Sequence, residues 1–240
     1  RQPMGEAANM MGLTQSMLAA AERIFELLDA EEMEEETGKP ALPEVHGDVT
    51  FKHVSFGYTP EVQLMKDLNI DVKAGETVAI VGPTGAGKTT VINLLMRFYD
   101  ITGGAIKIDG HNIQDYTKES LRSKVGMVLQ DTWLFKGTIR ENIRYSRQDA
   151  TDEEVVAAAK QAFADDFIRK LPKGYDTVIT EESDNISQGQ KQLLTIARAI
   201  LASPSVFILD EATSNVDTRT EVEIQKAMDH IMTNKTSFVI

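Results

Sequence analysis

The stretch GPTGAGKTT, residues 82–90, restricts the possible folds of this chain more than any other part of the sequence. It follows a short β-rich, apolar run, Thr77–Val81, and leads into residues 89–99, where apolar side chains recur at helical spacing. Its spacing matches G-x-x-x-x-G-K-[ST], and a glycine loop between a strand and a helix is typical of phosphate-binding loops in α/β proteins. An ordinary glycine-rich turn is the alternative, and the flanking patterns argue against it. The stretch therefore predicts that the chain binds a nucleoside triphosphate.

Each residue type in this loop has a chemical role toward a nucleotide. Glycines allow backbone N–H groups to turn toward a polyphosphate, and the N-terminus of the following helix adds partial positive charge. Lys88 is expected to contact the β- and γ-phosphates and so to take part in catalysis, and the Thr89 hydroxyl to ligate Mg²⁺. The candidate nucleotide-binding residues of the loop are Gly82, Thr84, Gly85, Ala86, Gly87, Lys88, Thr89 and Thr90.

The composition limits which other partners and chemistries are open to the chain. With 240 residues, 42% of them hydrophobic and 26% charged, the chain can form one large core or two lobes. A formal net charge of −12 argues against a nucleic-acid backbone as a general partner. Zero cysteines exclude disulfides, thiolate metal sites and a cysteine nucleophile. No apolar run of about 18 residues occurs, so no membrane span is expected.

Three regions differ in sequence pattern. Residues 1–30 are expected to form a helix that is apolar along one broad side, and the acidic residues 31–47, with their glycines and prolines, a linker. From residue 48 onward strands and helices alternate, which predicts a mixed α/β core with a helical insertion. The expected strands lie at residues 49–56, 68–72, 77–81, 103–110, 124–130, 205–212 and 237–240, and the expected helices at 89–99, 138–146, 151–163, 189–202 and 220–232.

Two carboxylates end the apolar run VFILDEA. Ligands of parallel sheets bind at the carboxyl edge of the strands, so Asp210 and Glu211 are expected to point into the nucleotide crevice. Asp210 is the expected Mg²⁺ partner opposite Thr89, and Glu211 is placed to polarise the attacking water as a general base. Acidic residues after a strand also cap helices, and the phosphate loop favours the functional interpretation over that one.

Residues 185–221, NISQGQKQLLTIARAILASPSVFILDEATSNVDTRTE, resemble the signature-to-Walker-B block of ATP-binding cassette (ABC) proteins. ISQGQ stands where the family usually has L-S-G-G-Q, and SNVD resembles its D-loop. The resemblance covers about residues 48–240, and its ordered set of motifs is highly specific. It implies a P-loop NTPase core with a mostly parallel sheet, an antiparallel β subdomain and a helical subdomain at about residues 133–204, with the C-terminal end truncated.

The resemblance also implies roles for residues outside the phosphate loop. Tyr58, in VSFGYTP, stands where the family keeps an aromatic residue that stacks on adenine, although by itself it could be a loop-packing residue. Gln130 resembles the Q-loop glutamine, which ligates Mg²⁺ and links the nucleotide to the membrane domain. Ser187, Gly189 and Gln190 belong to the signature, which faces the γ-phosphate held by the opposite subunit. Without the family, Ser187 would be a plain helix N-cap.

The first residues of the chain favour the exporter branch of the family. Residues 1–30 resemble the cytoplasmic end of the last membrane-spanning helix of exporters that fuse both domains in one chain; the alternative is an amphipathic helix packed on its own domain. The resemblance implies an ATPase at the cytoplasmic face of the membrane that drives export and works with its own transmembrane domain. Trp133 and Phe135 resemble the segment that contacts the membrane domain, and a core role is equally open. A non-hydrolysing nucleotide-binding dimerisation module is the alternative function, and Glu211 argues against it.

Two details bear on assembly and activity. Gln188 replaces the usual glycine of the signature, which favours a heterodimer with a second half-transporter over a homodimer. The family places a histidine just after the strand that begins SFVI, and the sequence ends before it, so this piece by itself is expected to be a weak ATPase.

Overall fold

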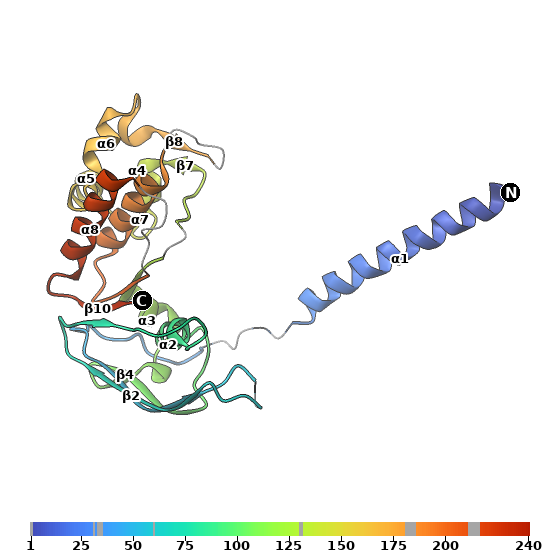
Figure 1. The fold of residues 1–240 in the computed structure, drawn as a ribbon, viewed down its shortest axis with the longest axis horizontal. Coiled ribbons are helices and arrows are strands. Elements are labelled where there is room, and N and C mark those ends of the chain that lie inside the picture. Colours follow the sequence, from blue (N-terminus) through green and yellow to red (C-terminus); the bar gives the residue numbers. More distant parts are fainter. Residues whose placement is uncertain are drawn as a thin grey trace. The chain divides into compact units, whose positions relative to one another are not determined.

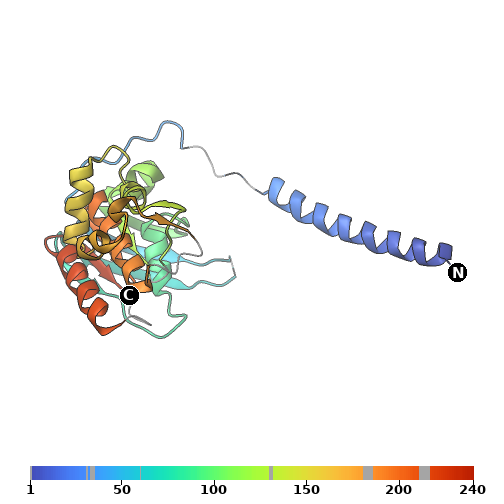
Figure 2. The ribbon, with the colours of Figure 1, turned by 90° about the horizontal axis from the view of Figure 1, so that it is seen from above.

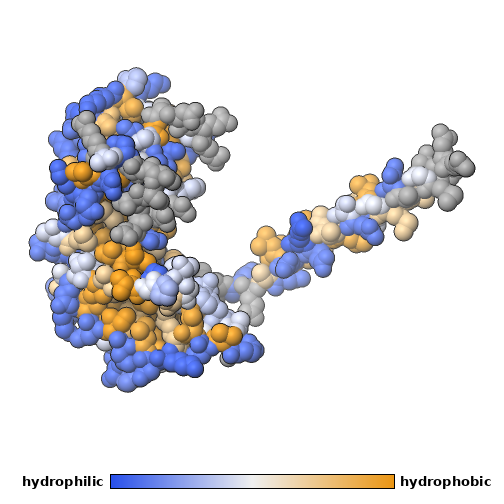
Figure 3. All heavy atoms as spheres, viewed as in Figure 1, coloured by the Kyte–Doolittle hydropathy of each residue, from blue (hydrophilic) through white to orange (hydrophobic). Residues whose placement is uncertain are grey.

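A computed structural model describes residues 2–30, 32, 36–59, 61–129, 132–180, 186–210 and 217–240. These residues form two compact units, Arg1–Gly38 and Lys39–Ile240. The first unit contains one helix, α1 (Gln2–Leu28), where the sequence predicts one (Figure 1). Hydrophobic and hydrophilic residues both occur along its surface (Figure 3). Neither α1 nor any other described helix combines the length and hydrophobicity needed to cross a membrane.

The second unit begins with an antiparallel sheet of order β2-β1-β4-β5. Its long central strand β1 (Val49–Phe56) pairs with β2 (Met65–Val72) on one side and β4 (Gly103–Ile108) on the other. The two-residue strand β5 (His111–Asn112) pairs with β4 at the edge of the sheet. The helical turn η1 (Ile113–Asp115) and helix α3 (Lys118–Ser123) follow it in the chain. Apolar side chains of β1 and β4 are buried against α2 (Lys88–Leu95) in one core cluster.

A parallel sheet of order β3-β10-β9-β6 forms the middle of the unit. Its strands are β3 (Thr77–Ala79), β10 (Thr236–Val239), β9 (Val206–Leu209) and β6 (Val125–Val128). Every residue of β9 is buried because the strand is covered on both faces. Val206 and Ile208 pack into the core that holds α2, whereas Phe207 and Leu209 pack into the core of the helical part. The sheet therefore joins two hydrophobic cores.

The helical part contains α4 (Ile139–Arg144), α5 (Asp152–Gln161), α6 (Asp165–Lys170), α7 (Gln188–Ala202) and α8 (Thr218–Met232). Helix α7 lies next to α4, α5 and α8, and the cluster can be followed from two directions (Figures 1 and 2). A capping box formed by Thr151 and Glu154 begins α5. A two-stranded sheet of β7 (Gly137–Thr138) and β8 (Val178–Ile179), and the turn η2 (Gly174–Asp176), complete this part. The parallel sheet, the antiparallel sheet and the helical part confirm the expected fold class.

The residues just before β1 are anchored in the second unit. Leu42 and Val45 are buried, and the hydroxyl of Ser205 donates to the Val45 carbonyl at 2.7 Å. The Asp109 carboxylate accepts the backbone N–H groups of residues 46–48. Residues 39–47 therefore pack with the domain that follows them.

Candidate active site

The loop between β3 and α2 has the backbone that its glycines predict. Gly85 and Gly87 have φ of 84° and 86°, in the left-handed region that residues with a Cβ rarely adopt. Ala86 N–H donates to the Pro83 carbonyl at 3.1 Å and closes a turn inside the loop. A Cβ at Gly87 would lie 3.1 Å from Met65 Cε, so glycine also lets the loop pass close to the β1–β2 hairpin. The loop conformation therefore depends on these two glycines.

Lys88 lies at the start of α2 with its side chain turned back over the loop. Its Nζ donates to the carbonyls of Gly82 at 2.7 Å and Pro83 at 3.2 Å. The N-cap of α2 is Gly87, which has no side chain to cap the helix, so the first N–H groups of α2 can face an anion. Thr89, the next residue, is exposed. A cationic Nζ, free N–H groups and a hydroxyl are thus gathered at one helix N-terminus.

Tyr58 follows β1 and lies against α2. Its hydroxyl is 2.9 Å from the hydroxyl of Thr90, which is buried. Its ring meets those of Phe56 and Tyr99 edge to face, with ring centroids 5.0 Å apart in both pairs. The Tyr58 side chain nevertheless remains 52% exposed. A half-exposed aromatic ring therefore lies beside the phosphate loop, and Tyr99 is a part of this cluster that was not predicted from the sequence.

Asp210 follows the last residue of β9, and its N–H donates to the Val128 carbonyl of β6 at 2.9 Å. Strand β10 pairs in parallel with both β3 and β9. The carboxyl ends of β3 and β9 therefore lie at the same sheet edge, with only β10 between the strand that ends at Asp210 and the strand that leads into the phosphate loop. Gln130 and Glu211, the other expected catalytic groups, lie outside the described residues.

The three signature candidates begin α7. Ser187 is its N-cap: the hydroxyl oxygen accepts from Gln190 N–H at 3.3 Å, and Gln190 Oε1 accepts from Ser187 N–H at 3.0 Å. Gly189 is buried. These bonds lie within the helix cap and not with the phosphate loop of the same chain. Both interpretations of Ser187, helix cap and anion contact, are compatible with this geometry.

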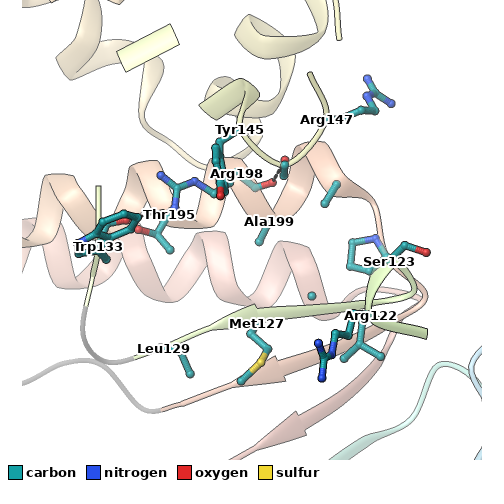
Figure 4. A pocket seen from close by; sticks show the side chains of 15 residues that line it. Arg122, Ser123, Met127, Leu129, Trp133, Tyr145, Arg147, Thr195, Arg198 and Ala199 are labelled. Atoms are coloured by element: carbon teal, nitrogen blue, oxygen red, sulfur yellow. Dashed lines mark hydrogen bonds between the residues drawn. The ribbon is translucent and has the colours of Figure 1, made fainter. Parts of the chain in front are cut away.

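A pocket of about 510 Å³ lies between β6, residues 145–147 just after α4, and helix α7 (Figure 4). Trp133 and Leu129 line it and are 63% and 45% exposed. Arg198 of α7 donates to the Trp133 carbonyl at 3.2 Å and lies over the rings of Phe135 and Tyr145. Burial lowers the pKa of Arg198 below its ordinary value. The pocket is mainly apolar, with Arg122, Arg147 and Arg198 in its wall.

Arg198 and buried Asn142 organise this region, and neither was predicted from the sequence. The guanidinium donates from Nε to the Asn142 carbonyl at 2.9 Å and from Nη2 to its side-chain oxygen at 3.1 Å. Asn142 also accepts from Phe135 N–H and donates to the Phe135 carbonyl. An asparagine within an amphipathic pattern gives no signal of such a role.

Comparison with known proteins agrees with this geometry. The family model described as "ABC transporter" matches residues 65–214. The "Fatty acid ABC transporter ATP-binding/permease protein" of Mycobacterium tuberculosis is 53% identical over 99% of this chain and 38% of its own length. The "Uncharacterized ABC transporter ATP-binding protein YfiC" of Bacillus subtilis is 55% identical over 99% of this chain and 40% of its own length. This chain thus spans about two fifths of these relatives.

A solved structure, "Structure of a bacterial Atm1-family ABC exporter with ATP bound", shares 43% identity and a TM-score of 0.80. It covers 95% of this chain, and the match spans 40% of that chain. The phosphate loop, the two sheets and the relatives lead to the same assignment: the chain belongs to the ABC transporter family.

Proposed function

We propose that this chain binds and hydrolyses ATP with Mg²⁺ and that the hydrolysis drives export by a larger transporter. The observation that carries the proposal is the α2 N-terminus, where Lys88, free N–H groups and Thr89 lie beside the open face of Tyr58. Tyr58 holds the adenine, and Lys88 exchanges the carbonyls of Gly82 and Pro83 for the β- and γ-phosphate oxygens. The loop N–H groups orient the phosphate chain.

The donors at this edge suit a magnesium ion. Mg²⁺ prefers hard oxygen ligands, and Thr89 and Asp210 supply a hydroxyl and a carboxylate. Gln130 is the third proposed ligand. When bound, Mg²⁺ neutralises charge that develops on the phosphates during transfer. Glu211, the residue after Asp210, accepts a proton from the attacking water as general base.

The function test uses the full-length transporter and two contrasting variants. Glu211→Gln keeps the size and hydrogen bonding of the side chain but removes the base, so ATP binds while steady-state turnover falls about 100-fold or more. Lys88→Ala instead weakens ATP binding itself because it removes a positive charge at the phosphates. Both ATPase rate and equilibrium ATP affinity are measured. Normal turnover in Glu211→Gln would contradict the base role, and an inactive wild type that still binds ATP would favour the non-hydrolysing module.

Further proposals concern the partners. We place the ATP between the phosphate loop of one chain and the signature of a second, with Ser187, Gly189 and Gln190 acting in trans. A different half-transporter is the favoured second chain, and the chain's own transmembrane domain holds the assembly at the cytoplasmic face of the membrane. No nucleic-acid partner is proposed, because the net charge is −12.

The pocket at Trp133 is the proposed contact with the membrane domain. An exposed indole beside an apolar hollow of about 510 Å³ suits a helix that inserts apolar side chains. A photo-crosslinking amino acid at position 133 of the full-length transporter should capture a segment of the membrane domain. The same amino acid at Val222, exposed on α8, is the control and should not. Equal capture from both positions would exclude the pocket as the specific contact.

A further inference from the structure

Residues 132–135, here called the strap, are attached to α7 at two separate points. Gln188, the first residue of α7, donates from Nε2 to the Thr132 hydroxyl at 2.9 Å. Near the other end of the helix, Arg198 donates from Nη1 to the Trp133 carbonyl at 3.2 Å. Consecutive strap residues therefore contact opposite ends of the helix that carries the signature. A displacement of the strap acts on both ends of α7.

The two attachments differ in strength. At the Arg198 end, the strap is held by buried Asn142, which exchanges hydrogen bonds with Phe135 at 2.8 and 3.1 Å. Arg198 adds hydrogen bonds to Asn142 and covers the Phe135 ring at 5.4 Å. At the other end, the Gln188–Thr132 bond joins two partly or fully exposed side chains. The first turn of α7 is thus joined to the strap by a link that can be removed without opening the core.

The backbone at Gln188 gives no reason for glycine at this position. Gln188 is the first helical residue of α7 and does not have a positive φ. It follows the N-cap Ser187, and Gln190 completes the capping box. The Gln188 side chain is turned toward Thr132 of its own chain. A glycine at position 188 would keep the helix start and the capping box but would lose the link to the strap.

We propose that Gln188 is a positioning residue, which ties the first turn of the signature helix to the strap through Thr132 and so links the Trp133 pocket to the ATP site. The inference rests on the proposed function, because it takes the start of α7 as the part that meets ATP in trans. With the tie in place, the first turn is already ordered when ATP arrives. Without the tie, the first turn is ordered for ATP contact in only a fraction of the molecules, and the apparent affinity for ATP falls in proportion to that fraction.

The test is a double-substitution cycle in the full-length transporter. The variants are Gln188→Ala, Thr132→Val, both together, and Thr132→Ser, which keeps the hydroxyl. Each of the first two removes the same bond, so each should raise the KM for ATP about 2- to 10-fold and raise KM more than it lowers kcat. The double variant should match either single variant, because the bond can be lost only once. Thr132→Ser, which keeps the hydroxyl, should have a KM for ATP close to that of the wild type.

Two controls separate positioning from folding. Gln225→Ala removes another exposed glutamine, on α8, whose side chain donates to Asp229 at 3.2 Å, and should leave KM unchanged. Thermal unfolding of each variant reports any loss of folded protein, which would lower kcat without raising KM.

Independent, additive effects of Gln188→Ala and Thr132→Val on KM would overturn the inference, as would an unchanged KM in both. Glu211→Gln, run in the same assay, distinguishes the failures. If Glu211→Gln abolishes turnover and the cycle is additive, only the positioning role fails. If Glu211→Gln hydrolyses ATP normally, the proposed mechanism fails instead.

Discussion

Tyr58 is fixed in place yet accessible, which is what a stacking platform requires. The bond to Thr90 and the edge contact with Phe56 restrain the ring, and about half of the side chain stays exposed. The aromatic ring and the hydroxyl can be tested separately, because phenylalanine keeps the ring and loses only the bond to Thr90.

Tyr58→Ala is therefore expected to weaken ATP binding and Tyr58→Phe to change it little. Stacking of a base on an aromatic ring is worth roughly 1–3 kcal/mol, so alanine should raise the Kd for ATP about 5- to 150-fold. Equilibrium titration with ATP measures the effect. An equal loss in both variants would show that the hydroxyl bond to Thr90, and not the ring, supports binding.

At the same scale, the sequence predicts backbone conformation better than side-chain partners. The motif spacing places glycines where the loop needs positive φ, as Gly85 and Gly87 show. It cannot predict that Lys88 rests on two loop carbonyls, or that Thr90 is buried under Tyr58. The Lys88 contacts depend on how the loop itself folds, and the Tyr58–Thr90 contact joins segments that meet only in the fold.

Among the elements, the short helix α6 contains a buried charged group. The Asp165 carboxylate accepts hydrogen bonds from the Tyr175 hydroxyl at 2.6 Å and from Arg169 Nε at 2.8 Å, and Asp165 is 8% exposed. Burial by itself raises the pKa of Asp165, but the bonds from Arg169 and Tyr175 outweigh it, so the pKa lies below its ordinary value. In return, burial and the bond to Asp165 raise the pKa of Tyr175.

Asp165→Asn should consequently destabilise the chain by about 1–3 kcal/mol at pH 7, since the tyrosine and arginine lose a charged acceptor. A carboxyl group whose pKa is lower in the folded than in the unfolded state stabilises the fold at pH values above the unfolded pKa, about 3.9. This stabilisation is lost as the pH falls through the pKa of the folded state. The difference in the free energy of unfolding between wild type and Asp165→Asn should therefore shrink below pH ~4. Urea unfolding at several pH values measures it, with Asp166→Asn, exposed on the same helix, as control. A difference that does not vary with pH would contradict the role of the Asp165 charge.

The elements that sequence patterns missed are short. Strands β5, β7 and β8 have two residues each, and α3 and α6 have six, so none has enough residues to display a period. Longer elements were predicted to within a few residues, and β1 matches at both ends. The run Val206–Leu209 was recognisable because a strand covered on both faces is apolar at every position.

On the scale of the whole assembly, the open question is which chain supplies the second half of each ATP site. A different half-transporter is expected as partner because glycine, the usual residue at the position of Gln188, has conformational freedom that glutamine lacks. The helical backbone there removes the conformational part of that argument. What still supports the pairing is the departure of Gln188 from the glycine usual in the signature, since its side chain is tied to Thr132.

The pairing predicts that the full-length chain needs a second, different half-transporter for full ATPase activity. In the proposed arrangement each site joins the phosphate loop of one chain to the signature of the other, so a partner with L-S-G-G-Q would complete the site built on Lys88, Asp210 and Glu211. The chain's own signature would complete a second site that mostly holds ATP. The full-length chain is expressed alone and together with the product of an adjacent half-transporter gene, and basal ATPase is compared at equal protein. Coexpression should raise turnover several-fold, and Glu211→Gln in this chain should abolish most of that gain. Full activity from the chain alone would refute the pairing, because both sites of a homodimer carry Gln188 and would then be shown to tolerate it.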